Sequence, residues 1–260
     1  MPVRKLFERQ RKYIKNLQQS RSFRYEEQQC IIEGSKPIKD LLNSDHAPEY
    51  LVFNEKALGG SSKLNDFYED SLKSIECLVT DKFDSLSEQE KPEGVLAVCT
   101  MPASLTNLET FITGKSRLLA LFDINDPGNL GSIIRTSLWF NVDGILLIGD
   151  CVDPFSPKVT RSSMGTVFSM PLISFALVGR QDKEALHDWE IVSTFLGTPN
   201  TWQSSEPKEK RILLLGSESH GLDPHLKQFC TTNYLISRQG KGESLNLAAA
   251  AALAIRDVLV

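Results

Sequence analysis

Residues 211–222 read RILLLGSESHGL, an apolar run that stops at Gly216 and continues as a short polar loop. The near-continuous apolar pattern of 212–215 is typical of a strand buried on both faces of a parallel sheet. Two earlier runs have the same character, LLALFDI at 118–124 and GILLIG at 144–149. Because helical patterns separate the runs, the sequence predicts an α/β fold built on a parallel sheet.

These runs lie in the larger of two predicted units, residues 117–260. Its expected strands are 118–124, 144–148, 191–196, 212–215 and 234–236. Its expected helices are 130–140, 157–163, 183–189, 223–229 and 245–258. Ligands of open α/β sheets bind beyond the carboxyl ends of the strands, so a site is expected in the turns that follow them.

A smaller unit, residues 25–100, precedes this one and is joined to it by a linker at 101–116. Its expected strands are 30–32, 50–53, 75–79 and 95–98. Its expected helices are 37–42, 64–74 and 81–86. The alternation predicts a small α/β sandwich. Since it carries no constellation of catalytic residues, we interpret it as a recognition domain.

Positive charge is concentrated in the N-terminal segment, residues 1–24. This segment carries eight Lys or Arg residues and one Glu, in a chain whose formal net charge is −4. The remainder is therefore acidic, with 21 basic against 32 acidic residues. A basic arm on an acidic body is a pattern that grips phosphate backbones. A solvated helix with one charged face is the alternative.

The five cysteines and four histidines are scattered, and no CxxC pair occurs. This predicts reduced thiols and neither a zinc site nor a metal enzyme. No apolar run of about 18 residues occurs, which predicts no membrane span. The N-terminus lacks the apolar core of a secretory signal, so a cytoplasmic location is expected. A mitochondrial transit peptide is the alternative, because the segment is basic with a single acidic residue.

Three polar clusters follow predicted strands, and the first is DINDPGNLGSIIRTSLWF, residues 123–140. Pro127 and Gly128 predict a turn, and Asn129 is the expected N-cap of the next helix. The residues expected on its buried face are Leu130, Ile133, Ile134 and Leu138. Those expected on the other side are Asn129, Ser132, Arg135 and Thr136. An Asn and an Arg would then point together, with a cap and an unrelated surface arginine as the alternative.

The second cluster is the loop from Gly216 to Gly221, whose glycines allow a flat ligand close to exposed backbone N–H groups. It matches neither a Walker A loop nor a GxGxxG fingerprint. Glu218 is expected to hold the loop shape by accepting hydrogen bonds from amides, although a solvated glutamate is the alternative.

The third cluster is GKGESLNLAAAAALAI, residues 240–255. Gly240 and Gly242 predict a flexible turn, and Ser244 is the expected N-cap of the terminal helix. Asn246 has a local explanation as well, since Asn competes for backbone partners near helix starts. The alanines are explained as helix formers.

Taken in order and spacing, the three clusters resemble the SpoU (TrmH-like) family of RNA ribose 2′-O-methyltransferases, within the SPOUT superfamily. The first family motif, N-x-G-x-x-x-R-T, matches Asn129, Gly131, Arg135 and Thr136. The second, G-x-E-x-x-G, matches Gly216, Glu218 and Gly221. The third, G-x-x-E-S-L-N, matches Gly240, Glu243, Ser244, Leu245 and Asn246. The match covers 117–260. The N-terminal part is similar to the family's substrate-binding domain, which is like ribosomal RNA-binding proteins.

The resemblance implies a parallel-sheet domain with a deep trefoil knot near the C-terminus, and a homodimer with the site near the subunit interface. It implies S-adenosylmethionine as cofactor and RNA as partner, with ribosomal RNA as the expected substrate. The implied cofactor-binding residues are Gly216, Gly221, Ile236, Gly240, Leu245 and Thr194. A tRNA 2′-O-methyltransferase is one alternative, and a non-catalytic RNA-binding or ribosome-assembly protein is another.

The resemblance also implies roles for the polar residues. Arg135 would contact the phosphate of the target nucleotide and stabilise the developing alkoxide, because a guanidinium stays protonated in proteins. Ser244 and Asn246 would orient the ribose, and Asn129 would brace the region of Arg135. Glu218 would shape the cofactor loop.

The chain departs from the family pattern at two places. Ile236-Ser237-Arg238 stands where the family commonly has Ile-Pro-Met, and Trp139-Phe140-Asn141 stands where small residues with a glycine are usual. These changes affect the rigidity of the cofactor loop and dimer packing, and leave the polar set intact.

Overall fold

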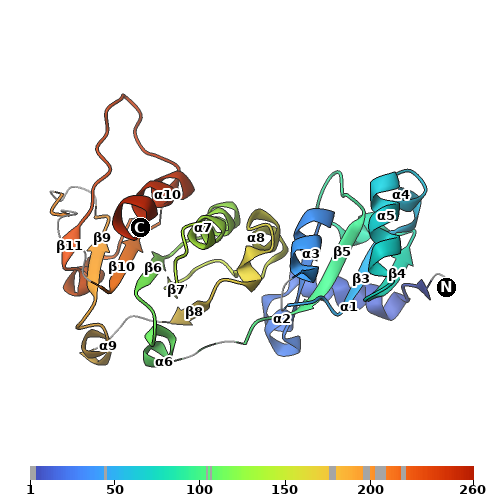
Figure 1. Cartoon of the computed structure of the whole chain (residues 1–260), viewed down its shortest axis with the longest axis horizontal. Helices are drawn as coiled ribbons and strands as arrows, with labels where there is room; N and C mark the ends of the chain where they lie inside the picture. The colour runs from blue at the N-terminus through green and yellow to red at the C-terminus, as the bar shows by residue number, and fades with distance from the viewer. Residues whose placement is uncertain are drawn as a thin grey trace. The chain divides into compact units, whose positions relative to one another are not determined.

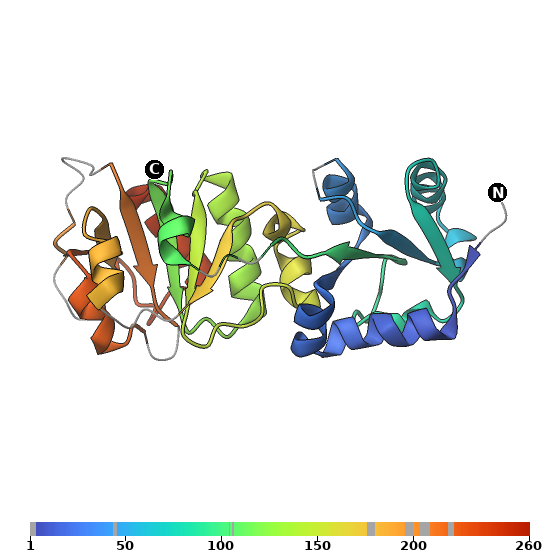
Figure 2. The same cartoon turned by 90° about the horizontal axis from the view of Figure 1, so that it is seen from below.

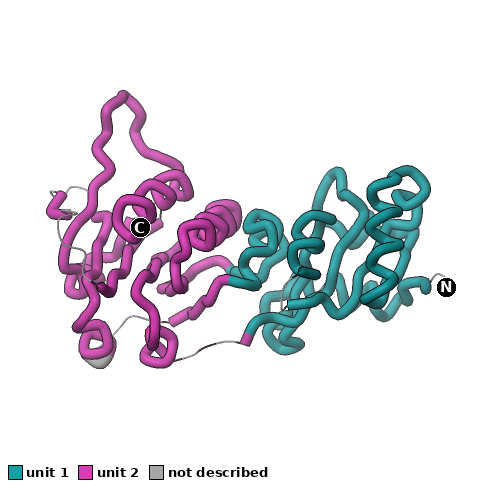
Figure 3. The backbone as a smooth tube through the Cα atoms, viewed as in Figure 1, with its two compact units in different colours: residues 1–102, 153–169 teal, residues 103–152, 170–260 magenta. Residues whose placement is uncertain are grey.

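The computed structural model describes residues 4–43, 46–103, 105, 107–175, 180–195, 200–202, 209–217 and 221–260. The chain divides into two compact units, which are coloured separately in Figure 3. Unit 1 comprises Met1–Pro102 and Asp153–Ser169, and unit 2 comprises Ala103–Val152 and Met170–Val260.

Unit 1 is built on a five-stranded sheet of order β1-β4-β3-β5-β2. Its strands are β1 (Arg4–Lys5), β2 (Gln29–Glu33), β3 (Tyr50–Asn54), β4 (Glu76–Thr80) and β5 (Val95–Thr100). The strands β1, β4 and β3 pair in parallel, whereas β5 is antiparallel to both β3 and β2. The four strands expected from the sequence are all present in this sheet.

The helices of unit 1 are α1 (Glu8–Gln19), α2 (Arg21–Glu27), α3 (Ser35–Leu42), α4 (Glu55–Leu58), α5 (Ser62–Ser71) and α8 (Pro157–Ser162). The helix expected at 81–86 is a 3-10 helix, η1 (Phe83–Leu86), and a second one follows α8, η2 (Thr166–Phe168). Most of the basic N-terminal segment is helical, and Ile14 and Leu17 of α1 are buried in the core of the unit. Figure 2 shows α1 lying along the sheet.

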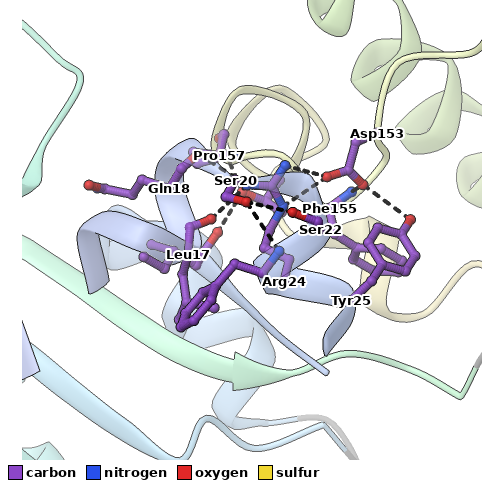
Figure 4. Close-up of polar contacts among 12 residues, drawn as sticks. Leu17, Gln18, Ser20, Ser22, Arg24, Tyr25, Asp153, Phe155 and Pro157 are labelled. Atoms are coloured by element: carbon purple, nitrogen blue, oxygen red, sulfur yellow. Dashed lines mark hydrogen bonds and ion pairs between the residues drawn. The ribbon is translucent and has the colours of Figure 1, made fainter. Parts of the chain in front are cut away.

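The segment Asp153–Ser169 belongs to unit 1 although the sequence analysis placed it in the larger unit. Asp153 is buried and accepts a hydrogen bond from Arg24 Nε at 2.8 Å, and Tyr25 Oη donates to its other oxygen at 3.2 Å (Figure 4). Arg24 Nη1 also donates to the carbonyls of Leu17 (2.6 Å) and Gln18 (3.1 Å). The pair therefore fixes α1 and α2 to the segment that begins at Asp153.

Replacing Arg24 with methionine is expected to destabilise unit 1 by about 3–5 kcal/mol, because the Asp153 carboxyl would be left buried without its partner. The double variant Arg24→Met/Asp153→Leu is expected to recover a large part of that loss. Urea unfolding of the variants measures both, with Lys73→Met as the control, since Lys73 pairs with Asp70 at an exposed position. The prediction would be contradicted if the double variant lost as much unfolding free energy as Arg24→Met and Asp153→Leu lose together.

Unit 2 is built on a parallel sheet of order β11-β9-β10-β6-β7-β8. Its strands are β6 (Arg117–Phe122), β7 (Gly144–Ile148), β8 (Leu172–Phe175), β9 (Glu190–Ser193), β10 (Arg211–Leu215) and β11 (Thr232–Asn233). The predicted α/β fold with a parallel sheet is confirmed. The apolar runs of β6, β7 and β10 are buried, as expected of strands covered on both faces.

The helices of unit 2 are α6 (Leu108–Ile112), α7 (Pro127–Trp139), α9 (Arg180–Ala185) and α10 (Leu247–Val258), with the 3-10 helix η3 (Pro224–Phe229). Figure 1 shows α7 and α10 side by side on one face of the sheet, with α6 and α9 on the other. In the described residues, no helix is long and apolar enough to cross a membrane.

Several expectations for unit 2 are wrong in detail. The N-cap of α7 is Asp126, whose Oδ1 accepts from the backbone N–H of Asn129 at 2.7 Å, so Asn129 lies within the helix. Leu138 is 38% exposed and leaves the buried face. The N-cap of α10 is Asn246 in place of Ser244.

The remaining differences concern the ends of elements. The strand expected at 234–236 is β11, two residues earlier, and the helix expected at 183–189 is α9, which ends at Ala185. The helix expected at 223–229 is the 3-10 helix η3, and β8 has no counterpart in the prediction. The predicted strand 191–196 is β9, which ends at Ser193, and Leu196 lies outside the described residues.

Candidate active site

A pocket of about 350 Å³ lies at the carboxyl ends of β6 and β10, the two central strands of the unit 2 sheet. This is where the strand order reverses, the position at which open α/β sheets bind ligands. Its walls come from the turn after β6, the residue after Gly216, and the starts of α7 and α10. The lining residues are Asp123, Ile124, Asn125, Asp126, Asn129, Ser217 and Leu247.

A hydrogen bond between two asparagines joins the first and third clusters at this pocket. Asn246 Nδ2 donates to Asn129 Oδ1 at 2.9 Å across 117 positions of the chain. Asn246 Oδ1 accepts from the backbone N–H groups of Ala248 (3.0 Å) and Ala249 (3.3 Å). The oxygen of Asn246 therefore caps α10 while its amide nitrogen contacts Asn129. One side chain both caps the helix and joins the two clusters.

The turn after β6 is fixed by the turn after β7. Asp123 has a positive φ of 53°, and its Oδ1 accepts from the backbone N–H of Asp150 at 2.7 Å. Gly149 leaves the space that this contact needs, since a Cβ there would overlap the Asp123 carboxylate. The backbone of Ile124 is held on both sides, by Cys151 Sγ at 3.4 Å and the N–H of Val152 at 2.8 Å. Asp123 and Asp126 form the acidic lip of the pocket, and these contacts hold its backbone in place at Asp123 and Ile124.

Asp123, Asn125 and Asp126 are pocket residues that sequence reasoning missed as site residues. The signal was present, because they directly follow a buried strand of the parallel sheet.

The loop after β10 closes on itself at its two glycines. Ser217 and Gly221 exchange backbone hydrogen bonds, at 3.1 Å and 2.9 Å. A Cβ on Gly216 would overlap the backbone of Gly221 and lie 2.6 Å from the N of Leu222. Gly221 has a φ of 68°, which L side chains rarely adopt. Both motif positions therefore require glycine for geometric reasons. Glu218 lies outside the described residues.

Thr194 is hydrogen-bonded to the central strand β10. Its backbone N–H and its Oγ1 both donate to the carbonyl of Leu214, at 3.2 Å and 3.3 Å. Ile236 is half-buried at the start of the segment 234–246, which Figure 1 shows projecting from the sheet between β11 and α10. Gly240, Ser244 and Leu245 are exposed on this segment.

Arg135 is exposed on α7, and no hydrogen bond or ion pair joins it to a residue that the structure describes. The structure therefore brings Asn129 and Asn246 together. It connects neither Arg135 nor Ser244 to them. An unpaired guanidinium on the surface remains able to receive an anionic group.

A model of the SpoU rRNA Methylase family matches residues 116–256, more than half of the chain. The chain belongs to the SpoU rRNA methylase family. A second model, the MRM3-like substrate binding domain, matches residues 9–97 of this SpoU chain.

Relatives of this SpoU protein include a methyltransferase of Bacillus subtilis (strain 168), the 23S rRNA (guanosine(2553)-2′-O)-methyltransferase RlmP. It is 29% identical over 228 residues, which are 86% of each chain. The mitochondrial rRNA methyltransferase 3 of Homo sapiens is 29% identical over 189 residues, 70% of this chain and 41% of that protein.

Solved structures show the same fold over nearly the whole chain. The AdoMet-bound rRNA methyltransferase from Sinorhizobium meliloti has a TM-score of 0.79 at 25% identity, covering 98% of this chain and 96% of that one. The SpoU methyltransferase AviRb from Streptomyces viridochromogenes has a TM-score of 0.77 at 24% identity, covering 96% of each. The predicted family is confirmed. The prediction of an RNA methyltransferase that uses S-adenosylmethionine is confirmed with it. The knot and the homodimer stay predictions.

The five cysteines of this SpoU chain are free, and none is set up as a nucleophile. Burial raises the pKa of all five thiols above the ordinary value, that of Cys77 to about 11. Thiols with raised pKa values stay protonated near neutral pH and react poorly. Covalent attack by a cysteine on a base therefore has no support in this protein.

Replacing Asn246 with serine is expected to lower methyl transfer about 100-fold while leaving stability nearly unchanged. Serine also caps a helix well, but its shorter side chain has no amide to reach Asn129. Single-turnover kinetics measures the first effect and thermal unfolding the second. Asn246→Ala serves as the comparison, since it loses the cap as well and costs about 1 kcal/mol. Full activity in Asn246→Ser would show that the bridge to Asn129 has no role.

Proposed function

We propose that this protein methylates a ribose 2′-hydroxyl in ribosomal RNA with S-adenosylmethionine as the methyl donor. The observation that carries the proposal is the Asn129–Asn246 hydrogen bond, which joins two family motifs at a pocket beyond the central strands. The relatives named above support ribosomal RNA as the substrate, and so does the match of residues 9–97 to a substrate-binding domain.

The pocket has the volume of a small-molecule site, and its charge suits the cationic end of S-adenosylmethionine. About 350 Å³ falls within the range of small-molecule sites. The carboxylates of Asp123 and Asp126 line it, and a ligand with a sulfonium and an ammonium group favours such surroundings. The loop from Gly216 to Gly221 and the segment of Ile236, Gly240 and Leu245 would supply backbone contacts to the adenosine part, with Thr194 behind them. When bound, the cofactor supplies a methyl group already activated on sulfur.

The residues of the chain would position the ribose and stabilise charge. Bound S-adenosylmethionine would supply its methyl group to the ribose oxygen and leave as the neutral thioether, and the hydroxyl proton would pass to water. Arg135 stays protonated throughout, so its role is to stabilise the developing alkoxide and to contact the adjacent phosphate. Asn129 and Asn246 would hold the wall against which the ribose lies, with Ser244 beside them and Glu218 shaping the cofactor loop.

A homodimer in the cytoplasm is part of the same proposal. Small side chains on α10 allow close packing, and α7 ends in the exposed Trp139. A mitochondrial location is the alternative, because one relative is the mitochondrial rRNA methyltransferase 3 of Homo sapiens.

The proposal is tested by methyl transfer from tritiated S-adenosylmethionine to purified ribosomal RNA and tRNA, followed by alkaline digestion. Label in alkali-resistant dinucleotides of ribosomal RNA is expected, because a 2′-O-methyl group blocks cleavage of the adjacent bond. Label confined to tRNA would establish the alternative substrate. No heat on titration with S-adenosylmethionine, together with no label, would establish a non-catalytic RNA-binding protein.

A further inference from the structure

The N-terminal end of α1 carries a surface that no part of the active site explains. A hollow of about 690 Å³ is lined there by Phe7, Arg9, Gln10, Lys12, Tyr13 and Asn16, which we call the α1 hollow. All six residues belong to unit 1. Phe7 is 73% exposed, an unusual position for a large aromatic side chain.

Several other cations of the basic segment are paired within the fold. Arg4 and Lys5 pair with Glu76 and Glu55, and Arg24 is buried against Asp153. Arg9 and Lys12 are exposed, and no ion pair or hydrogen bond joins them to a described residue. Charge that the fold leaves unpaired is available to an anionic partner.

The one carboxylate of α1 does not cancel this charge. Glu8 pairs with Arg11, and that hydrogen bond lowers the pKa of Glu8, with Lys15 and Lys82 acting in the same direction. Glu27 and Gln29 both accept hydrogen bonds from Tyr13 Oη, at 3.0 Å and 2.7 Å. Tyr13 is therefore anchored by its hydroxyl, with its ring edge against Phe23.

The backbone presents Phe7 from a fixed position. Its N–H donates to Gln10 Oε1 at 3.0 Å, and its carbonyl accepts from the N–H of Arg11 at 3.0 Å. Because the backbone of Phe7 is already fixed, only the side-chain torsions lose freedom when a flat group stacks on the ring. An exposed aromatic ring beside unpaired cations is the combination with which proteins hold unpaired nucleotides.

We propose that the α1 hollow binds a single-stranded segment of RNA, with a base stacked on Phe7 and the flanking phosphates on Arg9 and Lys12. This rests on the proposed function, because it assigns part of the RNA substrate to a surface of unit 1. The bases of a duplex are stacked within it and cannot reach the ring, so the surface selects unpaired strands.

The test is fluorescence anisotropy of the full chain with a labelled oligouridylate of about 12 nucleotides and a duplex of the same length, over a series of salt concentrations. Phe7→Ala is expected to weaken single-strand binding about tenfold without changing its salt dependence. Arg9→Gln/Lys12→Gln is expected to make the slope of log K against log salt less steep by about 1.4. Duplex binding by Phe7→Ala should equal that of the unaltered chain.

The matched control is Lys63→Gln/Lys73→Gln, which removes the same charge from exposed positions in and after α5. Equal single-strand binding by Phe7→Ala and the unaltered chain would overturn the inference. A control double variant that weakens binding as much as Arg9→Gln/Lys12→Gln would overturn it too. Methyl transfer to ribosomal RNA by the unaltered chain is measured separately, so failure of the proposed function is recognised independently of the oligouridylate result.

Discussion

Replacing Arg135 with alanine is expected to lower methyl transfer by about 100- to 1000-fold while leaving the affinity for S-adenosylmethionine unchanged. Loss of one group that stabilises a developing oxyanion has effects of this size. The affinity is retained because Arg135 is exposed on α7 and does not line the pocket. Single-turnover kinetics at saturating cofactor measures the first quantity, and isothermal titration measures the second.

Two further variants make this prediction specific to the guanidinium. Arg135→Lys keeps the charge but loses the planar fork that contacts phosphate oxygens in pairs, so we expect activity between that of the alanine variant and the unaltered chain. Arg256→Ala is the matched control, because Arg256 is exposed on α10 and pairs with Asp257. Activity retained in Arg135→Ala would remove this residue from the mechanism.

Replacing Gly216 with alanine is expected to raise the dissociation constant for S-adenosylmethionine about 100-fold. The new Cβ would overlap the backbone of Gly221, which cannot yield as a flexible side chain can. Overpacking of this kind costs about 1–3 kcal/mol, and the loop must open to relieve it. The closed form, to which we assign cofactor binding, would then become a minor population, and the apparent affinity would fall in proportion.

Two other glycines serve as comparisons for Gly216→Ala. A Cβ on Gly221 meets nothing within 4 Å, so Gly221→Ala is affected only by its left-handed φ and should lose less affinity. Gly60→Ala in unit 1 places its Cβ no closer than 3.9 Å to another atom and should bind the cofactor normally. Normal affinity in Gly216→Ala would show that the closed loop is not the form that binds.

The fold of unit 2 was predictable because buried parallel strands leave a direct record in the sequence. The runs of β6, β7 and β10 are apolar throughout, and all three are buried. Strands without such runs were harder to place. The strand β11 is only two residues long, yet the N–H of Tyr234 beyond it still donates to Ser193 O at 2.8 Å. The end of β11 therefore cannot be predicted from the amino-acid composition of this segment.

The helix caps were assigned wrongly from the sequence because each region offers more than one residue able to cap. Asp126 and Asn129 are both suitable for α7, and Pro127 at the first helical position was the signal that favoured Asp126. Ser244 and Asn246 are both suitable for α10. Only the fold shows that Asn246 can cap α10 and reach Asn129 at the same time.

The attachment of Asp153–Ser169 to unit 1 was also invisible to sequence reasoning. It depends on contacts between residues that are far apart in the chain, such as Arg24 with Asp153 and Thr160 Oγ1 with the carbonyl of Ile31 at 2.8 Å. None of these four residues carries a sign of its partner in the neighbouring sequence. The same holds for the pocket, whose acidic lip and asparagine bridge come from segments that meet only in the folded sheet.

The central claim is that this chain places a methyl group on a ribose of ribosomal RNA, and mapping of 2′-O-methyl positions across all cellular RNA tests it most directly. Cells with and without the gene are compared, and the gene is then restored as the unaltered or the Arg135→Ala form. The account predicts that a ribosomal RNA position loses its methyl group and regains it only with the unaltered form. Unchanged 2′-O-methylation in ribosomal RNA, or full restoration by Arg135→Ala, would contradict it.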